Sequence, residues 1–282
     1  MKQIVVISGK GGTGKTVLTA SFAALAKNKV MADCDVDAAD LHLLLHPAIK
    51  ERVEFRSGKT ARINKGLCVQ CGQCIDACRF EAINEDFIVD PVSCEGCGLC
   101  ARLCPVSAIK MDENTSGEWY VSETKYGPMI HAKLGIAEEN SGKLVSLVRK
   151  KAKELAEDEK RDYIIIDGPP GIGCPVIASL SGVDFALVVT EPTLSGIHDM
   201  QRVLDVARHF KTETKVVINK CDLNPENSGK IRSICKEKQI EVAGEIPFSK
   251  KVSESIVKRV PLVEDIDGPI RDEIVSIWRR IS

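Results

Sequence analysis

Eight of the twelve cysteines in this 282-residue chain lie between positions 68 and 104. They form two runs of the pattern C-x2-C-x2-C-x3-C, and the second run begins 26 residues after the first. Seven of the sixteen positions from each first cysteine onward are identical in the two runs, which indicates a duplicated unit. A unit this short cannot bury a core of its own, whereas bonds between thiolates and metal can stabilise it. The spacing therefore predicts a small metal-binding segment.

Disulfide bonds and zinc are the other common uses of clustered cysteines. A disulfide framework is typical of small secreted chains, but this chain begins with a short apolar run that glycines soon follow, unlike an export signal. We therefore expect a cytoplasmic protein with reduced thiols. Zinc sites usually take their ligands as two separated pairs, whereas each run here supplies four cysteines in succession. Iron–sulfur clusters account for the pattern better than zinc.

In proteins with two clusters and this spacing, the fourth cysteine of each run ligates the cluster of the other run. One [4Fe-4S] cluster is therefore expected on Cys68, Cys71, Cys74 and Cys104. The second [4Fe-4S] cluster is expected on Cys94, Cys97, Cys100 and Cys78. Proline follows the last cysteine of the second run, as is usual, but Arg79 takes that place in the first. The segment resembles bacterial two-cluster ferredoxins, which implies a small α+β fold.

Outside this segment, continuous apolar runs alternate with amphipathic patterns of helical period. The expected strands lie at residues 4–8, 30–32, 163–166, 185–189 and 215–218. Expected helices lie between them, at residues 142–156, 197–210 and 228–238. This alternation predicts an α/β fold with a mostly parallel sheet flanked by helices. Because residues 58–118 interrupt it, we expect a small domain inserted into a larger one that comprises residues 1–57 and 119–282.

A glycine-rich loop follows the first expected strand. Residues 9–16 read GKGGTGKT and match the phosphate-binding motif G-x-x-x-x-G-K-[ST], in the strand–loop–helix context that this motif requires. Backbone N–H groups in such a loop surround phosphate oxygens, helped by the helix N-terminus. Lys15 would reach the β- and γ-phosphates and Thr16 would bind Mg²⁺. The expected phosphate-site residues are Gly9, Gly11, Gly12, Thr13, Gly14, Lys15 and Thr16.

An additional lysine, Lys10, stands at the start of this loop. The string KGGTGKT resembles the deviant Walker A motif of the MinD/Mrp superfamily of P-loop ATPases. In that superfamily the early lysine reaches across a dimer to the partner's nucleotide. The resemblance therefore implies a homodimer with nucleotide between its subunits, and a catalytic role for Lys10 beside that of Lys15.

Two acidic segments also resemble the superfamily. The first, DCDVDAAD at residues 33–40, resembles the first switch; Asp35 would then position the attacking water, and Asp40 would be a switch residue at the nucleotide. An alternative is that these acidic residues only cap the next helix. The second, DGPPG at residues 167–171, resembles the second switch. Asp167 would then hold Mg²⁺, and the Gly171 N–H would contact the γ-phosphate.

Residues 219–222 read NKCD and follow the last expected strand. In the superfamily an asparagine here contacts adenine, which assigns Asn219 to the base. The same four residues match N-K-x-D, the guanine signature of G proteins, in which Asp222 would read the base. The remaining motifs favour ATP over GTP. Pro247 lies where related proteins contact the base with their backbone.

Composition excludes other classes of partner. A formal net charge of −1 and an aromatic content of 4% do not favour nucleic acid. No apolar run is long enough for a membrane span. The amphipathic segment 270–281 is interpreted as facing the core, so membrane association is not expected. The other cysteines, Cys34, Cys174, Cys221 and Cys235, are interpreted as buried thiols.

The combined motifs predict an ATP-hydrolysing, homodimeric iron–sulfur protein. Its nucleotide state would control electron transfer through the two clusters to a redox partner protein. One alternative is assembly or delivery of iron–sulfur clusters, as in Mrp-type scaffolds, although the late C-x2-C of those proteins is absent here. The other is a regulatory switch like MinD.

Overall fold

The computed structural model describes residues 1–135 and 141–282 and divides into two compact units. The larger unit comprises Met1–Val53, Trp119–Lys133 and Ser141–Ser282. The smaller unit comprises Glu54–Glu118 together with residues 134 and 135. Residues 58–118 all belong to the smaller unit. Two long strands, β3 (Ala48–Ile63) and β4 (Ile109–Thr124), contribute residues to both units.

One sheet runs in the order β3-β4-β5-β2-β6-β1-β7-β8-β9. Its parallel strands are β1 (Lys2–Ser8), β2 (Lys29–Asp33), β5 (Gly127–Leu134), β6 (Tyr163–Pro170), β7 (Phe185–Thr190), β8 (Glu213–Asn219) and β9 (Glu241–Ile246). All the expected strands are among them. The central strands β1, β2, β6 and β7 are mostly buried, because helices cover both faces of a parallel sheet, whereas β8 and β9 carry exposed or half-buried polar residues. The predicted α/β class is confirmed.

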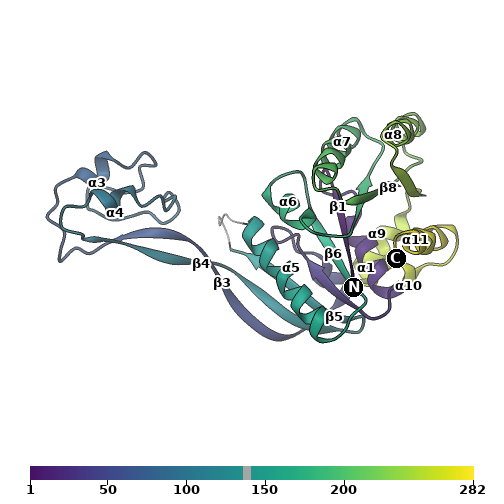
Figure 1. The fold of residues 1–282 in the computed structure, drawn as a ribbon, viewed down its shortest axis with the longest axis horizontal. Helices are drawn as coiled ribbons and strands as arrows, with labels where there is room; N and C mark the ends of the chain where they lie inside the picture. Colours follow the sequence, from purple (N-terminus) through teal and green to yellow (C-terminus); the bar gives the residue numbers. More distant parts are fainter. Residues whose placement is uncertain (136–140) are drawn as a thin grey trace. The chain divides into compact units, whose positions relative to one another are not determined.

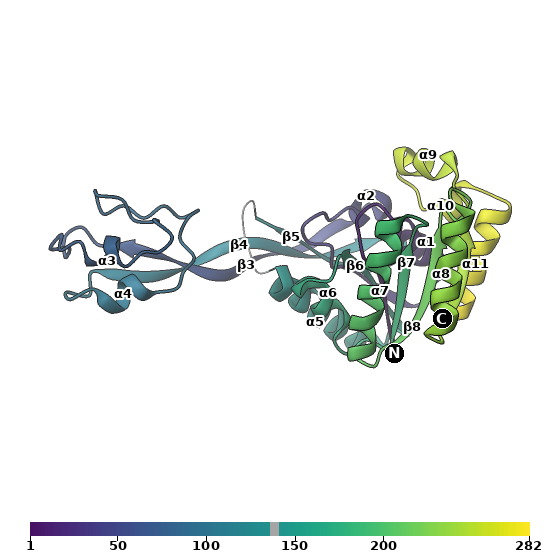
Figure 2. The ribbon, with the colours of Figure 1, turned by 90° about the horizontal axis from the view of Figure 1, so that it is seen from above.

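Helices cover both faces of this sheet in the larger unit (Figures 1 and 2). One set is α1 (Lys15–Leu25), α2 (Leu41–Leu45), α9 (Lys250–Lys258), α10 (Leu262–Asp265) and α11 (Pro269–Ile281). The other set is α5 (Ser141–Asp158), α6 (Cys174–Leu180), α7 (Leu194–His209) and α8 (Pro225–Glu237). Ile4 and Val6 share a core with α1 and α11. Val5 and Ile7 are equally buried and point to the opposite face, because side chains alternate along a strand.

The amphipathic C-terminal segment forms α11, and its apolar stripe faces the core as expected. Ile274, Ile277 and Ile281 are buried, and Trp278 packs against Phe22 with ring centroids 5.4 Å apart. Burying each of these side chains contributes about 1.5–3 kcal/mol to folding. None of the helices in the described ranges combines the length and apolarity needed to cross a bilayer.

The smaller unit repeats its backbone as well as its cysteines. Its two short helices, α3 (Gln73–Asp76) and α4 (Leu99–Leu103), each begin after a glycine with positive φ, 78° at Gly72 and 72° at Gly98. The 26-residue offset also relates two further pairs with positive φ, which are Gln70 with Gly96 and Glu81 with Ser107. The unit has a small apolar core, a cluster of Ala61, Cys74, Ile83 and Ile109, with Phe55, Ala82 and Ala108 also buried.

Candidate functional site

The glycine-rich loop joins the end of β1 to the start of α1. Gly12 and Gly14 have φ values of 75° and 97°, which favour glycine over other residues. A Cβ on Gly14 would also clash with the Asn219 side chain, whose Nδ2 donates to the Thr13 carbonyl at 2.7 Å. The loop is therefore held against the end of β8, and its shape depends on glycine.

A cavity of about 500 Å³ opens beside this loop. That volume is typical of sites for small molecules and nucleotides. The predicted residues that line it are Gly11, Gly12, Gly14, Lys15, Thr16, Asp35, Asp40, Asn219 and Pro247. The predicted residues outside its lining are Gly9, Lys10, Thr13, Asp167, Gly171 and Asp222. The structure thus brings the loop, the first acidic segment and the end of β8 to one place.

Sequence reasoning missed the apolar wall of the cavity. This wall consists of Leu43, Leu44, Phe248, Val252 and Ile256, contributed by α2, α9 and the loop before α9. Ile256 and Phe248 are still 43% and 48% exposed. Apolar side chains left open beside a polar loop suit the flat face of a nucleobase. The only sequence signal is the strong amphipathic pattern of α9.

Asp167 and Asp33 occupy neighbouring positions at the carboxyl ends of β6 and β2. Both are fully buried, and burial raises the pKa of Asp167 to about 6 while Lys15 opposes the shift. Thr19 donates to Asp167 Oδ1 at 2.9 Å, but Oδ2 has no hydrogen-bond partner within the described residues. A buried carboxylate oxygen without a partner is costly, and a cation beside Lys15 and Thr16 would satisfy it. These residues therefore fit Mg²⁺.

Three carboxylates of the first acidic segment have different surroundings. Asp33 accepts the N–H groups of Asp35 and Leu41 at 3.2 and 3.3 Å, so it fixes the turn after β2 and caps the first residue of α2, as the capping alternative expects. Asp35 lines the cavity, and burial raises its pKa to about 6 against the effect of Lys15. Asp40 is the N-cap residue of α2, but among the described residues its side chain caps nothing. The capping alternative therefore does not apply to Asp40.

The NKCD residues contact the protein as well as the cavity. The Lys220 ammonium donates to the Gly12 carbonyl at 3.2 Å, and Lys220 lines the cavity. Asp222 lies outside the lining, and its Oδ1 accepts the Phe248 N–H at 2.7 Å. Asp222 therefore holds the loop that carries Pro247 and Phe248.

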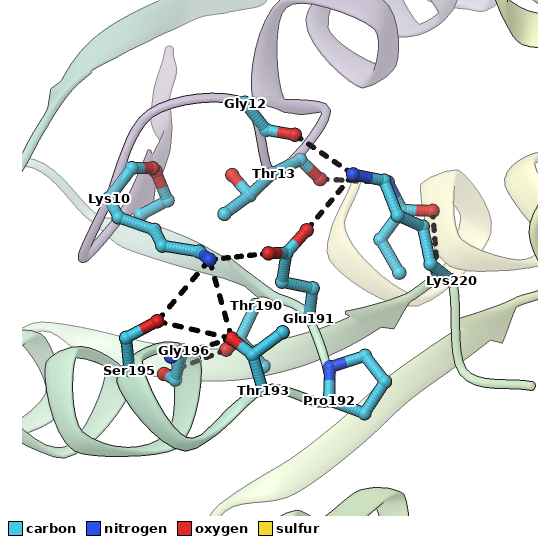
Figure 3. A network of polar contacts seen from close by, with 12 residues as sticks. Lys10, Gly12, Thr13, Thr190, Glu191, Pro192, Thr193, Ser195, Gly196 and Lys220 are labelled. Carbon is cyan, nitrogen blue, oxygen red and sulfur yellow. Dashed lines mark hydrogen bonds and ion pairs between the residues drawn. The ribbon is translucent and has the colours of Figure 1, made fainter. Parts of the chain in front are cut away.

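Lys10 lies outside the cavity lining, and its side chain points toward Glu191, Thr193 and Ser195 at the end of β7 and the start of α7 (Figure 3). Its ammonium forms an ion pair with Glu191 and contacts Thr193 Oγ1 at 3.3 Å and Ser195 Oγ at 3.4 Å. Glu191 also pairs with Lys220, at 2.9 Å. Neither Glu191 nor this bridging arrangement was indicated by a sequence motif.

Two small cavities in the smaller unit are each lined by four cysteines. Cys68, Cys71, Cys74 and Cys104 line one of them. Cys78, Cys94, Cys97 and Cys100 line the other. Within the residues that the structure describes, no three His, Cys, Asp or Glu side chains converge to hold a single ion. A four-iron cluster is larger than one ion, and thiolates spread around a cavity fit the cluster better than they fit zinc.

The remaining cysteines differ in burial. Cys34 and Cys235 are buried as expected, and burial raises the pKa of Cys235 to about 11. The expectation was wrong for Cys174, which is exposed at the start of α6, and for Cys221, which is partly exposed. Cys174 and Cys221 follow the carboxyl ends of β6 and β8, and residues after a strand end are less covered than residues within the strand.

Several known proteins are similar to this chain over most of its length. The family model of the CobQ/CobB/MinD/ParA nucleotide binding domain matches residues 4–262. An uncharacterised protein of Methanocaldococcus jannaschii is 34% identical over 99% of this chain and 96% of its own length. The structure of the MinD cell division protein of Aquifex aeolicus has a TM-score of 0.59 and 21% identity, covering 99% of this chain and 96% of that one.

Two further relatives are a pyruvate synthase subunit and an iron-sulfur cluster carrier. The pyruvate synthase subunit PorD of Methanothermobacter marburgensis is 36% identical over 75 residues, which are 24% of this chain and 93% of that protein. An iron-sulfur cluster carrier protein of Methanocaldococcus jannaschii is 24% identical over 99% of this chain and 83% of its own length.

Proposed function

Because this chain belongs to the CobQ/CobB/MinD/ParA family of nucleotide-binding domains, we propose that it hydrolyses ATP and couples its nucleotide state to electron transfer through two [4Fe-4S] clusters. The main support for the clusters is that two groups of four cysteines line two separate cavities. In this proposal the smaller unit is an inserted ferredoxin-like domain. The protein acts as a homodimer with a redox protein as its partner.

The cavity at the glycine-rich loop supports the nucleotide part of the proposal. ATP binds there with its phosphates at the backbone of residues 9–16 and its base beside Asn219 and Pro247. Lys15 neutralises charge on the β- and γ-phosphates. Thr16 and Asp167 would hold Mg²⁺, which would neutralise charge on the phosphates; Asp167 Oδ2 has no hydrogen-bond partner among the described residues. GTP is disfavoured because Asp222 lies outside the cavity lining and its Oδ1 accepts the Phe248 N–H.

Hydrolysis depends on placing a water molecule in line with the γ-phosphate. Asp35 lines the cavity, and its carboxylate is mainly ionised at pH 7 because its pKa is about 6. It can therefore accept a hydrogen bond from the water and orient its lone pair. The water oxygen bonds to the γ-phosphorus, the bond from that phosphorus to the β-phosphate oxygen breaks, a proton of the water passes to a phosphate oxygen, and ADP and phosphate leave. The Gly171 N–H donates to the Ser8 carbonyl at 2.9 Å, so it would contact the γ-phosphate only after nucleotide binding breaks this hydrogen bond.

The cysteine cavities support the redox part. The clusters, when bound, would each accept and release one electron. The thiolates of Cys68, Cys71, Cys74 and Cys104 would hold one of them. Burial raises the pKa of Cys74, so its thiolate depends on bonds to iron for stabilisation. The backbone N–H of Ala108 donates to Cys104 Sγ at 3.2 Å, an interaction that also favours the thiolate.

The test is a reductive titration of anaerobically purified protein. Iron and sulfide are quantified per chain, and the protein is titrated with dithionite with and without MgATP. Two retained clusters whose potential or reactivity changes with MgATP support the proposal. Iron-free protein, or clusters indifferent to nucleotide, would contradict it. The Lys15→Ala variant serves as control, because it should abolish ATP hydrolysis and the nucleotide effect but keep its iron.

A second candidate is delivery of iron–sulfur clusters, which the similarity to a named cluster carrier favours. The same purified protein distinguishes the two. Incubation with an apo-ferredoxin should leave the clusters in place if they serve electron transfer, whereas a carrier would pass them on. A third candidate, a spatial switch, is favoured by the similarity to MinD of Aquifex aeolicus and predicts a nucleotide-dependent partner without electron transfer.

A further inference from the structure

Glu191 lies between two lysines next to the phosphate-binding loop (Figure 3). Its Oε1 pairs with Lys10 and its Oε2 pairs with Lys220 at 2.9 Å. The Glu191 side chain is only 13% exposed, compared with 29% and 30% for the two lysines. The Glu191 carboxylate therefore holds both ammonium groups, one from the phosphate-binding loop and one from the residue after β8.

The backbone around Glu191 is fixed by a tight turn. The Thr193 N–H donates to the Glu191 carbonyl at 2.8 Å, and the Gly196 N–H donates to Thr193 Oγ1 at 3.0 Å as the cap of α7. A Cβ on Gly196 would clash with the Glu191 carbonyl, so the first turn of α7 lies directly on it. Glu191 is therefore presented to the lysines by a rigid support.

Both lysines have a second connection to the nucleotide site. Lys220 lines the cavity and donates to the Gly12 carbonyl at 3.2 Å, so its ammonium is attached to the loop that would surround the phosphates. Lys10 belongs to the loop itself. Ammonium groups beside a triphosphate form strong charge-assisted hydrogen bonds with it. Lys10 and Lys220, however, are already paired with the Glu191 carboxylate.

We propose that Glu191 is a positioning residue that holds Lys10 and Lys220 before nucleotide binds, so that the triphosphate competes with its carboxylate for both ammonium groups. The proposal rests on the nucleotide site of the proposed function. Only the fraction of nucleotide-free molecules in which the two lysines are free of Glu191 can then bind the triphosphate fully. The apparent affinity for MgATP is reduced by that fraction. Nucleotide binding then releases the Lys10 and Lys220 ammonium groups from Glu191.

The charge of Glu191 is consistent with this role. Burial alone would raise its pKa, but hydrogen bonds and charge from Lys10 and Lys220 outweigh burial and lower the pKa. The side chain is therefore a carboxylate at neutral pH. Because ion pairs with a mostly buried partner are screened less than surface pairs, the competition persists at physiological salt.

The test is calorimetric titration of the full chain with MgATP. The Glu191→Gln variant keeps the shape and hydrogen-bonding capacity but removes the charge, and it should bind MgATP about tenfold more tightly, or about 1.4 kcal/mol. Glu191→Asp keeps the charge on a shorter stem that spans the two lysines poorly, and it should give an intermediate affinity. This second variant also carries the test if the first fails to fold.

Glu264→Gln is the matched control. Glu264 accepts hydrogen bonds from Lys125 at 2.7 Å and Tyr126 at 2.8 Å, and none of these residues lines the cavity. The affinity of the Glu264→Gln variant for MgATP should therefore equal that of the wild type. In the Lys10→Ala background, Glu191→Gln should have a smaller effect, because only Lys220 remains to be released.

The outcomes separate this inference from the proposed function. If wild-type protein does not bind MgATP, both are overturned. If wild-type protein binds MgATP but Glu191→Gln leaves the affinity unchanged or weakens it, only the role of Glu191 is overturned, because the carboxylate would then be purely structural.

Discussion

Asp33 and Asp167 are in-register partners on the neighbouring parallel strands β2 and β6, and neither side chain is exposed. Burial raises the pKa of both carboxyls, and the charge of Asp167 raises that of Asp33 further. Two adjacent buried carboxylates destabilise a protein unless a cation or a proton neutralises them. This pair connects the stability of the larger unit to pH and to Mg²⁺.

The first prediction concerns pH. Because the pKa of Asp167 is raised from 3.8 to about 6, the folded protein binds this proton more tightly than the unfolded chain does. In EDTA and without nucleotide, the free energy of unfolding should therefore fall as pH rises from about 4 through about 6. Asp167→Asn should reduce this slope and raise stability at pH 7.5 by on the order of 2 kcal/mol.

Urea unfolding across pH measures this effect. Asp205→Asn is the control, because the Asp205 side chain is 60% exposed and pairs with Lys238 at the surface. It should leave the pH dependence unchanged. A lower stability of Asp167→Asn at pH 7.5 would show that the carboxylate stabilises the nucleotide-free fold.

The second prediction uses pairs of cysteine substitutions to determine which cysteines share a cluster. Cys68→Ser with Cys104→Ser removes two ligands from one cavity, so about half of the iron should remain. Cys94→Ser with Cys104→Ser removes one ligand from each cavity and should reduce iron at both. Iron analysis of anaerobic protein distinguishes the two variants. Equal iron in both variants would contradict the crossed arrangement.

The third prediction concerns Gly14. Alanine there meets both an unfavourable φ of 97° and the Asn219 side chain, so Gly14→Ala should lower stability by about 1–3 kcal/mol and abolish MgATP binding. Thermal unfolding and calorimetry measure these effects. Gly229→Ala is the control, because Gly229 lies inside α8 with open space for a Cβ among the described residues. It should raise stability by about 0.5–1 kcal/mol.

The fourth prediction separates the two interpretations of Asp222. If Asp222 holds the loop through the Phe248 N–H, Asp222→Ala should raise KM for ATP more than it lowers kcat, and GTP should compete poorly with both proteins. Steady-state ATPase kinetics with and without GTP measure this. Competition by GTP at concentrations similar to ATP, lost in Asp222→Ala, would instead assign Asp222 to guanine.

Some features of this protein could be predicted because they depend only on residues that are neighbours in the chain. The loop at residues 9–16 is a local motif whose glycines and lysine act within one turn, and the apolar strands are recognisable without their partners. The expected strands and the α/β class were predicted on this basis. The spacing of the cysteines is local as well, since the repeated positive φ at Gly72 and Gly98 comes from each run separately.

The rest was decided by which strands lie next to one another. Asp33 and Asp167 are distant in sequence, and only the pairing of β2 with β6 puts their carboxylates together. Glu191 reaches Lys10 and Lys220 because β7 lies between β1 and β8 in the sheet. The apolar wall from α9 depends in the same way on where that helix packs. Sequence patterns report local period and motif, whereas contacts between distant segments depend on strand order and register, which are set by the packing of the whole sheet.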